Sequence, residues 1–255
     1  MTQTEYFTSP QGRRLAYHQS AGQGPGVVFL GGFKSDMEGT KAVHLEAWAQ
    51  TTGRAFLRFD YSGHGQSSGA FTDGCIGDWA EDAMAAITTL TDGPQVLVGS
   101  SMGGWIALLC ARAMPERLAG LVTIAAAPDF TEDAMWQGFD AAQRAELATQ
   151  GQVALPSEYG EPYIITRRLI EDGRAHLVLR DPLDLPFPVR FLQGTADEDV
   201  AVSVALRLLE HAKGPDMRLT LVDGADHRFS DPGCLALIET SVAQVLELTG
   251  SAGSR

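Results

Sequence analysis

The sequence predicts an α/β fold in which a mostly parallel sheet is flanked by helices. Short apolar segments alternate with helix-compatible stretches along most of the chain, which is typical of parallel sheets. One apolar segment runs through a Gly-x-Ser-x-Gly pentapeptide directly into a helix-compatible stretch. A chain of 255 residues, 44% of them hydrophobic, is long enough to bury one large core, so we expect a single domain over residues 1–255.

The first two strands are expected to form an antiparallel hairpin, because residues 5–8 and 14–18 flank the turn sequence Ser-Pro-Gln-Gly at 9–12. Beyond this hairpin, short apolar segments with glycine or proline nearby are typical of buried strands. Six such segments are predicted to be strands: 27–30, 55–59, 96–98, 121–125, 189–192 and 219–222. These six strands and the two strands of the hairpin are expected to form one sheet.

Helices are predicted in the intervals between the strands. They span about residues 40–49, 78–90, 105–114, 202–212 and 234–248. The second of these carries its apolar side chains on one face. Asp78 followed by Glu81 resembles a capping box, which predicts that this helix begins at Asp78.

One interval is much longer than the others. About sixty residues separate Pro128 from Pro188, which is more than a crossover between parallel strands needs. We therefore expect a helical cap insertion at about residues 129–187, with helices near 131–149 and 163–172. Apolar side chains of this cap are candidates for a substrate pocket: Phe130, Met135, Trp136, Phe139, Tyr159 and Tyr163.

The Gly-x-Ser-x-Gly pentapeptide at residues 99–103 predicts a nucleophile at Ser101. A serine at a sharp turn between a strand and a helix needs small neighbours, and Gly99 and Gly103 stand at those positions. Ser100 does not fit the central position, because residues 98 and 102 are not glycine.

A serine hydroxyl needs a general base, and the base needs a carboxylate that orients it. His227 follows the last predicted strand in a short polar loop, and we expect it to be the base. Asp197 follows the strand at 189–192 and is the preferred acid, with Asp199 as the alternative. Loops at the carboxyl ends of parallel strands lie on the same edge of a sheet as the nucleophile.

Acyl transfer also needs donors for the developing oxyanion, and backbone amides at a helix start can supply them. We expect Met102 N–H to be one donor, because it directly follows the nucleophile. Phe33 N–H is expected to be the other, since the paired glycines before it allow the backbone to approach the substrate. Gly32, Trp105, Phe130 and Trp136 are expected to line the substrate pocket.

These residues together resemble the α/β-hydrolase family, and the resemblance covers nearly the whole chain. The family's order of Ser, Asp and His maps onto Ser101, Asp197 and His227. The resemblance implies an eight-stranded α/β-hydrolase fold with a cap. Residues 60–67 look like the family's turn after the fourth strand, in which His64 has a structural role. This chain has Gly31 where many relatives carry histidine.

Several short segments are similar to a subgroup with palmitoyl-protein thioesterase and acyl-glucuronide esterase activity. They are residues 31–33, 39–42, 99–105 and 169–174. The resemblance implies an acyl ester or thioester substrate, which includes an acylated protein cysteine. The mitochondrial members of the subgroup carry a transit peptide, and an Arg-rich leader is not found here.

The amino-acid composition limits which binding partners and which cellular compartment we expect for this protein. The net charge of −13 disfavours nucleic acid and anionic membranes as partners. Three cysteines without C-x-x-C spacing argue against a disulfide framework or a zinc site. We find no signal peptide or membrane-spanning stretch in the sequence and expect a cytoplasmic protein without membrane insertion, either a monomer or a homodimer.

The sequence thus predicts a serine hydrolase that cleaves carboxylic ester or thioester bonds through an acyl-enzyme on Ser101. No cofactor or metal is expected, because the triad performs this chemistry alone. Hydrolysis of C–C bonds or acyl transfer on the same triad is the alternative among enzymes. A catalytically silent binding protein of the same fold is the alternative of another class.

Overall fold

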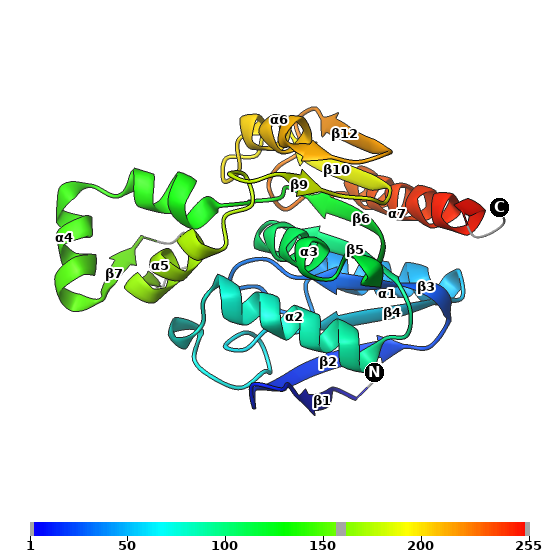
Figure 1. Ribbon diagram of the computed structural model, residues 1–255, viewed down its shortest axis with the longest axis horizontal. Coiled ribbons are helices and arrows are strands. Elements are labelled where there is room, and N and C mark those ends of the chain that lie inside the picture. Colours follow the sequence, from blue (N-terminus) through cyan, green and yellow to red (C-terminus); the bar gives the residue numbers. More distant parts are fainter. Residues whose placement is uncertain (1–2, 157–161, 253–255) are drawn as a thin grey trace.

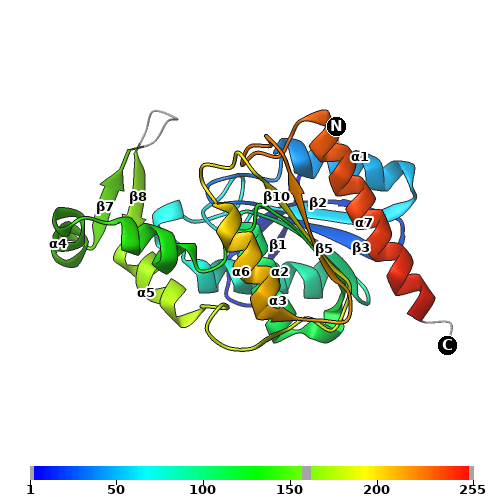
Figure 2. The ribbon, with the colours of Figure 1, turned by 90° about the horizontal axis from the view of Figure 1, so that it is seen from above.

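The computed structural model describes residues 3–156 and 162–252. An eight-stranded sheet runs through its centre in the order β1-β2-β4-β3-β5-β6-β10-β12, with helices on both faces (Figures 1 and 2). The strands of this sheet are β1 (Glu5–Thr8), β2 (Arg14–Ser20), β3 (Gln23–Leu30), β4 (Arg54–Phe59), β5 (Gln95–Ser100), β6 (Leu118–Ile124), β10 (Val189–Gly194) and β12 (Met217–Val222).

The pairing of the strands confirms the predicted fold. β1 pairs antiparallel with β2, and β2 antiparallel with β4, as expected for a hairpin at the edge of the sheet. All other neighbours in this sheet pair in parallel. The carboxyl ends of the parallel strands therefore meet at one edge, where their loops come together.

Helices cover the two faces of the sheet in two groups (Figure 2). One group is α1 (Thr40–Thr51) and α7 (Pro232–Ala252), and the other is α2 (Ile76–Leu90), α3 (Met102–Ala113) and α6 (Val202–His211). Side chains of β3 alternate between the two cores: Val27 and Phe29 pack on the side of α1 and α7, whereas Val28 and Leu30 pack on the other. Because both faces of the sheet are buried, the sequences of its central strands are continuous apolar runs.

The predicted start of α2 is wrong. The helix begins at Ile76, and the side chain of Cys75 before it makes no capping hydrogen bond; the carboxylate of Asp172 in the cap accepts from Gly77 N–H at 2.7 Å instead. Asp78 and Glu81 instead form ion pairs with Arg13, at 3.3 and 2.8 Å. Their carboxylates are drawn to a guanidinium from the β1–β2 turn, a tertiary contact that local spacing does not reveal.

The segment between β6 and β10, residues 125–188, is the cap segment. It contains a π-helical turn (Thr131–Trp136), α4 (Ala141–Gln150), β7 (Gln152–Leu155), β8 (Tyr163–Thr166), α5 (Arg167–Ala175) and the short β9 (Leu183–Asp184). β9 pairs in parallel with β11 (Ala212–Lys213). Single 3-10 turns elsewhere in the chain span Phe71–Asp73 and Pro115–Arg117. The helices and the hairpin of the cap segment project from the body of the molecule (Figure 1).

The predicted helices of the cap are only partly correct. The predicted helix at 131–149 is interrupted, because Asp140 accepts a hydrogen bond from Gln143 N–H and starts α4 anew. The predicted helix at 163–172 begins as a strand, since β8 pairs antiparallel with β7, and α5 starts only after Thr166. Residues 163–166 read Tyr-Ile-Ile-Thr and so favour a strand once a partner strand is available.

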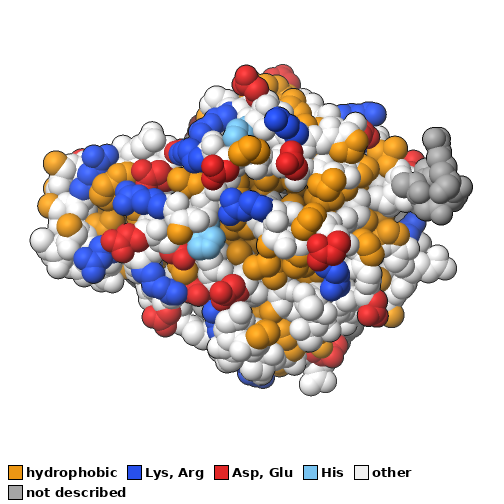
Figure 3. Space-filling view, in the orientation of Figure 1, with side chains coloured by type: hydrophobic (Ala, Val, Ile, Leu, Met, Phe, Trp, Pro, Cys, Tyr) orange, Lys and Arg blue, Asp and Glu red, His pale blue; other side chains and the backbone are white. Residues whose placement is uncertain are grey.

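Charged and apolar side chains are interspersed on the surface of the cap segment. Figure 3 shows apolar side chains between basic and acidic ones on the cap segment, at the left of the view. Some of these charges are paired within the cap, as between Arg174 and Glu132 at 2.6 Å. Within the described part of the chain, no helix is both long and apolar enough to cross a bilayer.

Asp129 links the two ends of the cap segment, and its side chain is fully buried. Its carboxylate accepts hydrogen bonds from the amides of Val178 and Leu179, at 2.8 and 3.0 Å, and from the guanidinium of Arg180 at 3.1 Å. Burial raises the pKa of Asp129, although these hydrogen bonds oppose the shift. Asp129 thus joins the start of the cap segment to its return.

Replacing Asp129 with alanine should lower the free energy of unfolding by about 2–4 kcal/mol, because two buried amides and a guanidinium lose their acceptor. Asp129→Asn keeps one acceptor oxygen and should lose less. Denaturant unfolding monitored by circular dichroism measures both changes. Asp181→Ala, an exposed aspartate of the same segment, should stay within about 0.5 kcal/mol of the original protein. Equal losses in Asp129→Ala and Asp181→Ala would contradict the anchoring role.

Candidate active site

Ser101 lies at a sharp turn between β5 and α3. Its backbone has φ 54° and ψ −119°, a left-handed conformation that side chains rarely adopt. The turn is held by a hydrogen bond from Ser101 N–H to the carbonyl of Ile124, at 2.9 Å. A Cβ added at Gly99 would lie 2.3 Å from the Gly103 carbonyl oxygen, and one at Gly103 only 2.0 Å from that of Leu30. Both glycines are therefore required for the close approach of β3, β5 and α3.

The imidazole of His227 connects the Ser101 hydroxyl to the carboxylate of Asp197. His227 Nε2 lies 3.1 Å from Ser101 Oγ, and Nδ1 lies 2.9 and 3.0 Å from the two oxygens of Asp197. A carboxylate accepts hydrogen bonds, so Nδ1 carries the proton and Nε2 presents its lone pair to the hydroxyl. The structure thus brings together three side chains from loops that are far apart in the sequence.

The surroundings of Asp197 keep it ionised. Its side chain has no exposed surface, and it accepts hydrogen bonds from Val200 N–H at 2.8 Å and Gln193 Nε2 at 2.9 Å. Burial by itself raises the pKa of Asp197, but the hydrogen bonds from His227 and from these groups outweigh burial and lower the pKa. The negative charge of the Asp197 carboxylate can therefore stabilise an imidazolium at His227.

Asp199, the alternative acid, lies close by without replacing Asp197. Its carboxylate lies within 4.8 Å of ligand atoms of Asp197 and His227, but its side chain is on the exposed side of the loop. Its backbone amide donates to Asp197 Oδ1 at 3.0 Å. The hydrogen-bond geometry therefore favours Asp197 as the partner of the imidazole.

The loops that carry Asp197 and His227 are bonded to each other. Ala196 N–H donates to the carbonyl of Ala225 at 3.0 Å, which ties the loop after β10 to the loop after β12. A Cβ at Gly194 would lie 2.1 Å from the same carbonyl oxygen. Gly194 is thus the residue that lets the two loops meet.

Gly32 and Phe33, expected near the nucleophile, lie in a turn beside it. A Cβ at Gly32 would lie 3.5 Å from Ser101 Cβ. The carbonyl of Gly32 accepts hydrogen bonds from the Ser35 amide and hydroxyl, at 3.2 and 2.9 Å. In a trans peptide, N–H and C=O point in opposite directions, so Phe33 N–H points away from Ser35. Lys34, the next residue, has φ 56°, which costs about 1–2 kcal/mol for a non-glycine residue.

The aromatic side chains predicted to line a pocket divide into two groups. The Phe33 ring packs edge-on against Phe71, Phe130 and Tyr163, with centroids 4.8, 5.6 and 6.3 Å away. Trp105 is fully buried and supports Phe130 at 5.6 Å.

The second group lies within the cap segment. Trp136 packs against Phe139 at 6.2 Å, between the guanidinium groups of Arg144 and Arg174. Met135 is partly buried against the main core. Tyr159 lies outside the described residues. The structure therefore places Phe130 and Tyr163 beside Phe33, and Trp136 in a different cluster.

A cavity of about 200 Å³ opens beside Ser101, on the side of α1. Its lining includes Gly32, Phe33, Asp36, Lys41, Ser101, His227 and Arg228. Burial lowers the pKa of Lys41, and its ammonium donates to the carbonyl of Arg228. Sequence reasoning did not find Lys41 or Arg228, although Arg228 directly follows His227. A larger hollow of about 470 Å³ lies on the cap segment, and none of Ser101, Asp197 and His227 lines it.

Met102 begins α3 directly after Ser101, and its side chain is fully buried. Its backbone N–H is one of the amides of the first helical turn, whose donors have no acceptor within the helix. The position is the one where a helix N-terminus favours a negative charge.

Comparison with known proteins gives one family and several relatives. The family model described as alpha/beta hydrolase fold matches residues 32–163. The palmitoyl-protein thioesterase ABHD10, mitochondrial, of Rattus norvegicus is 33% identical over 248 residues, which covers 96% of this chain and 83% of the relative.

Two solved structures extend the similarity to the whole fold. A putative hydrolase from Agrobacterium vitis S4 is 42% identical, with a TM-score of 0.92 and coverage of 96% of this chain and 98% of that one. The mouse alpha/beta hydrolase domain-containing protein 10 is 32% identical, with a TM-score of 0.89 and coverage of 96% and 99%. The cap segment is included in this coverage, so the resemblance inferred from short motifs is confirmed.

Replacing Gly103 with alanine should lower the free energy of unfolding by about 1–3 kcal/mol, because the added methyl group meets the backbone of Leu30. Denaturant unfolding measures the change. Gly138→Ala is a matched control, since a Cβ there meets nothing within 4 Å, and stability should stay equal or rise by up to about 1 kcal/mol. A Gly103→Ala protein as stable as the original would show that the turn at Ser101 has room for a side chain at residue 103.

Proposed function

The chain belongs to the α/β-hydrolase family, and on this premise we propose that it hydrolyses carboxylic ester or thioester bonds through an acyl-enzyme on Ser101. The observation that carries the proposal is the hydrogen-bonded chain from Ser101 Oγ through His227 to Asp197. A hydroxyl, a base and an orienting carboxylate in this arrangement are the requirements for nucleophilic acyl transfer.

In the first half of the reaction, His227 Nε2 takes the proton of Ser101 as its oxygen bonds to the carbonyl carbon. The negative charge that forms on the carbonyl oxygen is held by the amides of Phe33 and Met102. When the tetrahedral intermediate collapses, the bond to the leaving group breaks and His227 gives its proton to the departing alcohol or thiol. Asp197 stabilises the imidazolium throughout.

In the second half, water attacks the acyl-enzyme. His227 takes a proton from this water as the new C–O bond forms, and then returns it to Ser101 as the carboxylic acid departs. Each proton transfer passes through Nε2, while Nδ1 stays bonded to Asp197. These reaction steps need no cofactor.

The substrate is an acyl ester or thioester. The name of the rat relative, a palmitoyl-protein thioesterase, supports this class and extends it to an acylated cysteine of a protein. The aromatic group of Phe33, Phe130 and Tyr163 offers apolar surface for an acyl chain. A cytoplasmic location and a monomeric or homodimeric state stay predictions from the sequence; the name of the rat relative includes the word mitochondrial.

A fluorophosphonate probe should label this protein at Ser101, as peptide mass spectrometry of the adduct would show. Ser101→Ala should lose labelling and lower kcat for p-nitrophenyl butyrate by a factor of about 10⁴ or more, because no other group replaces the nucleophile. Ser203→Ala is the matched control, since Ser203 is exposed on α6, and it should keep full activity. Full ester turnover by Ser101→Ala would refute the assignment.

Removing the charge of Asp197 should impair the reaction far more than removing that of Asp199. Asp197→Asn should lower kcat about 10²–10⁴-fold, since the imidazole loses both its tautomer control and its counter-charge. Asp199→Asn should change kcat less than about threefold, because Asp199 holds Asp197 through its backbone amide, which the substitution keeps. Steady-state kinetics on the same ester decides the ranking, and the reverse order would make Asp199 the acid.

A further inference from the structure

The buried imidazole of His64 is not part of the triad, yet it contacts the loop that carries Phe33. The amide of Lys34 donates a hydrogen bond to His64 Nε2 at 3.3 Å. Only 4% of the His64 surface is exposed. Burial of a polar ring is unfavourable unless its nitrogen atoms are hydrogen-bonded, so the partners of His64 indicate its role.

The hydrogen bonds of His64 determine its tautomer. Nδ1 lies 3.2 Å from the carbonyl oxygen of Ser62, which can only accept, so Nδ1 carries the proton. Nε2 then presents a lone pair to the Lys34 amide, and the two contacts agree with one neutral tautomer. Burial, together with the nearby Lys34 ammonium, lowers the pKa of His64 and keeps the ring neutral.

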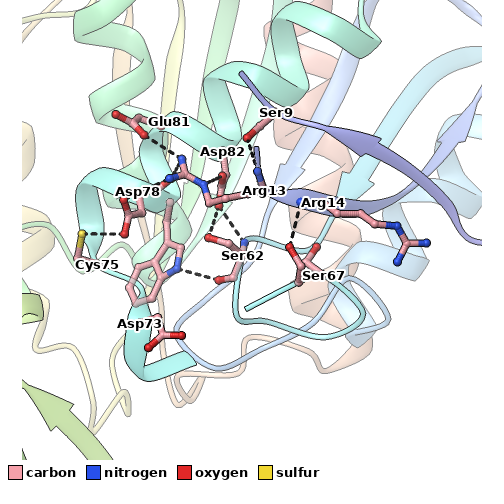
Figure 4. Close-up of polar contacts among 12 residues, drawn as sticks. Ser9, Arg13, Arg14, Ser62, Ser67, Asp73, Cys75, Asp78, Glu81 and Asp82 are labelled. Atoms are coloured by element: carbon pink, nitrogen blue, oxygen red, sulfur yellow. Dashed lines mark hydrogen bonds and ion pairs between the residues drawn. The ribbon is translucent and has the colours of Figure 1, made fainter. Parts of the chain in front are cut away.

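Ser62, which orients His64, is itself held by α2. Its amide and hydroxyl donate to Asp82 Oδ2, at 2.8 and 2.6 Å, and its carbonyl accepts from Trp79 Nε1 at 3.1 Å (Figure 4). Asp82 is fully buried and accepts from Arg13 Nε at 2.6 Å. The imidazole is thus the last member of a polar chain that begins at the β1–β2 turn.

The same aromatic side chains hold the His64 ring and the Phe33 ring. His64 packs edge-on against Phe71 and Trp79, with centroids 5.3 and 5.1 Å away. Phe33 packs edge-on against the same two rings, at 4.8 and 6.0 Å. The side chain of Phe33 and the amide of Lys34 are therefore both attached to one frame.

The backbone between these attachments is strained. Ser35 N–H bonds back to the Gly32 carbonyl across Phe33 and Lys34, and Lys34 has φ 56°. A turn with positive φ at its third residue usually has glycine there. If the Lys34 amide lost its acceptor, Lys34 would relax toward negative φ by rotation of the Phe33–Lys34 peptide, and the turn that fixes the direction of Phe33 N–H would change.

We propose that His64 is a positioning residue for the oxyanion hole: its Nε2 holds the Lys34 amide and thereby aims Phe33 N–H at the developing oxyanion. The inference rests on the proposed ester hydrolysis at Ser101. It assigns to His64 a role in the transition state in addition to the structural role that the sequence motif implies.

The first test replaces His64 with phenylalanine, which keeps an aromatic ring in the frame and removes both nitrogens. We expect kcat for p-nitrophenyl butyrate to fall about 10- to 100-fold with KM changed less than about twofold, since the interaction acts on the oxyanion and not on the bound ester. The Ki of an alkyl trifluoromethyl ketone, which forms a tetrahedral adduct with an oxyanion, should rise by the same factor.

Rescue distinguishes positioning from packing. His64→Gln, whose amide oxygen can accept near the place of Nε2, should recover most of kcat. In the His64→Phe protein, Lys34→Gly should raise kcat at least about threefold, because glycine keeps positive φ without strain, whereas Lys34→Ala should not. His211→Phe is the control histidine: His211 is the last residue of α6 and does not line the cavity beside Ser101, so kcat should stay unchanged.

The outcomes separate the inference from the function on which it rests. If His64→Phe folds and keeps kcat and inhibitor affinity, or if the glycine and alanine double variants have equal kcat, the positioning role is overturned. If His64→Phe does not fold, a folded His64→Gln protein that loses kcat about 10- to 100-fold also overturns the role, because an acceptor for the Lys34 amide would then be present without effect. If the original protein shows no Ser101-dependent ester hydrolysis, the proposed function itself fails.

Discussion

The left-handed backbone at Ser101 is the constraint on which the rest of the site depends. It lifts the hydroxyl above the carboxyl edge of the sheet only because β3, β5 and α3 approach each other to backbone contact. Gly99 and Gly103 permit that approach, and the buried cores on both faces of the sheet supply the free energy that holds it. The strained backbone at Ser101 therefore depends on the packing of the whole body of the molecule.

Two further loops complete the site by bonding to each other and to Ser101. The loops after β10 and β12 meet where Gly194 leaves room for the Ala225 carbonyl, and this contact places His227 between Asp197 and Ser101. The buried carboxylate stays charged because its hydrogen bonds outweigh its burial. On the other side of Ser101, the polar chain that ends at His64 and the aromatic rings around it hold the turn of Phe33. Strain at both Ser101 and Lys34 is thus balanced by contacts made at a distance.

The fold was largely predictable because apolar strands and intervening helices are local patterns. All eight strands of the main sheet were expected, and most ends agree within about two residues. The errors lie where a distant partner overrides local preference. β8 is a strand because β7 pairs with it, and the carboxylates of Asp78 and Glu81 are drawn to Arg13 instead of capping α2.

The sequence by itself determined the order of serine, acid and histidine and the strand ends at which they stand, because the Gly-x-Ser-x-Gly pentapeptide and loops that contain glycine can be recognised within a few residues. Only the tertiary structure decided that the His227 imidazole bonds to Asp197 and not to Asp199, and that His64 reaches the Lys34 amide. Neighbouring carboxylates are equivalent in a sequence, whereas their distances to one imidazole depend on how two loops pack. Hydrogen bonds between groups far apart along the chain follow from that packing alone.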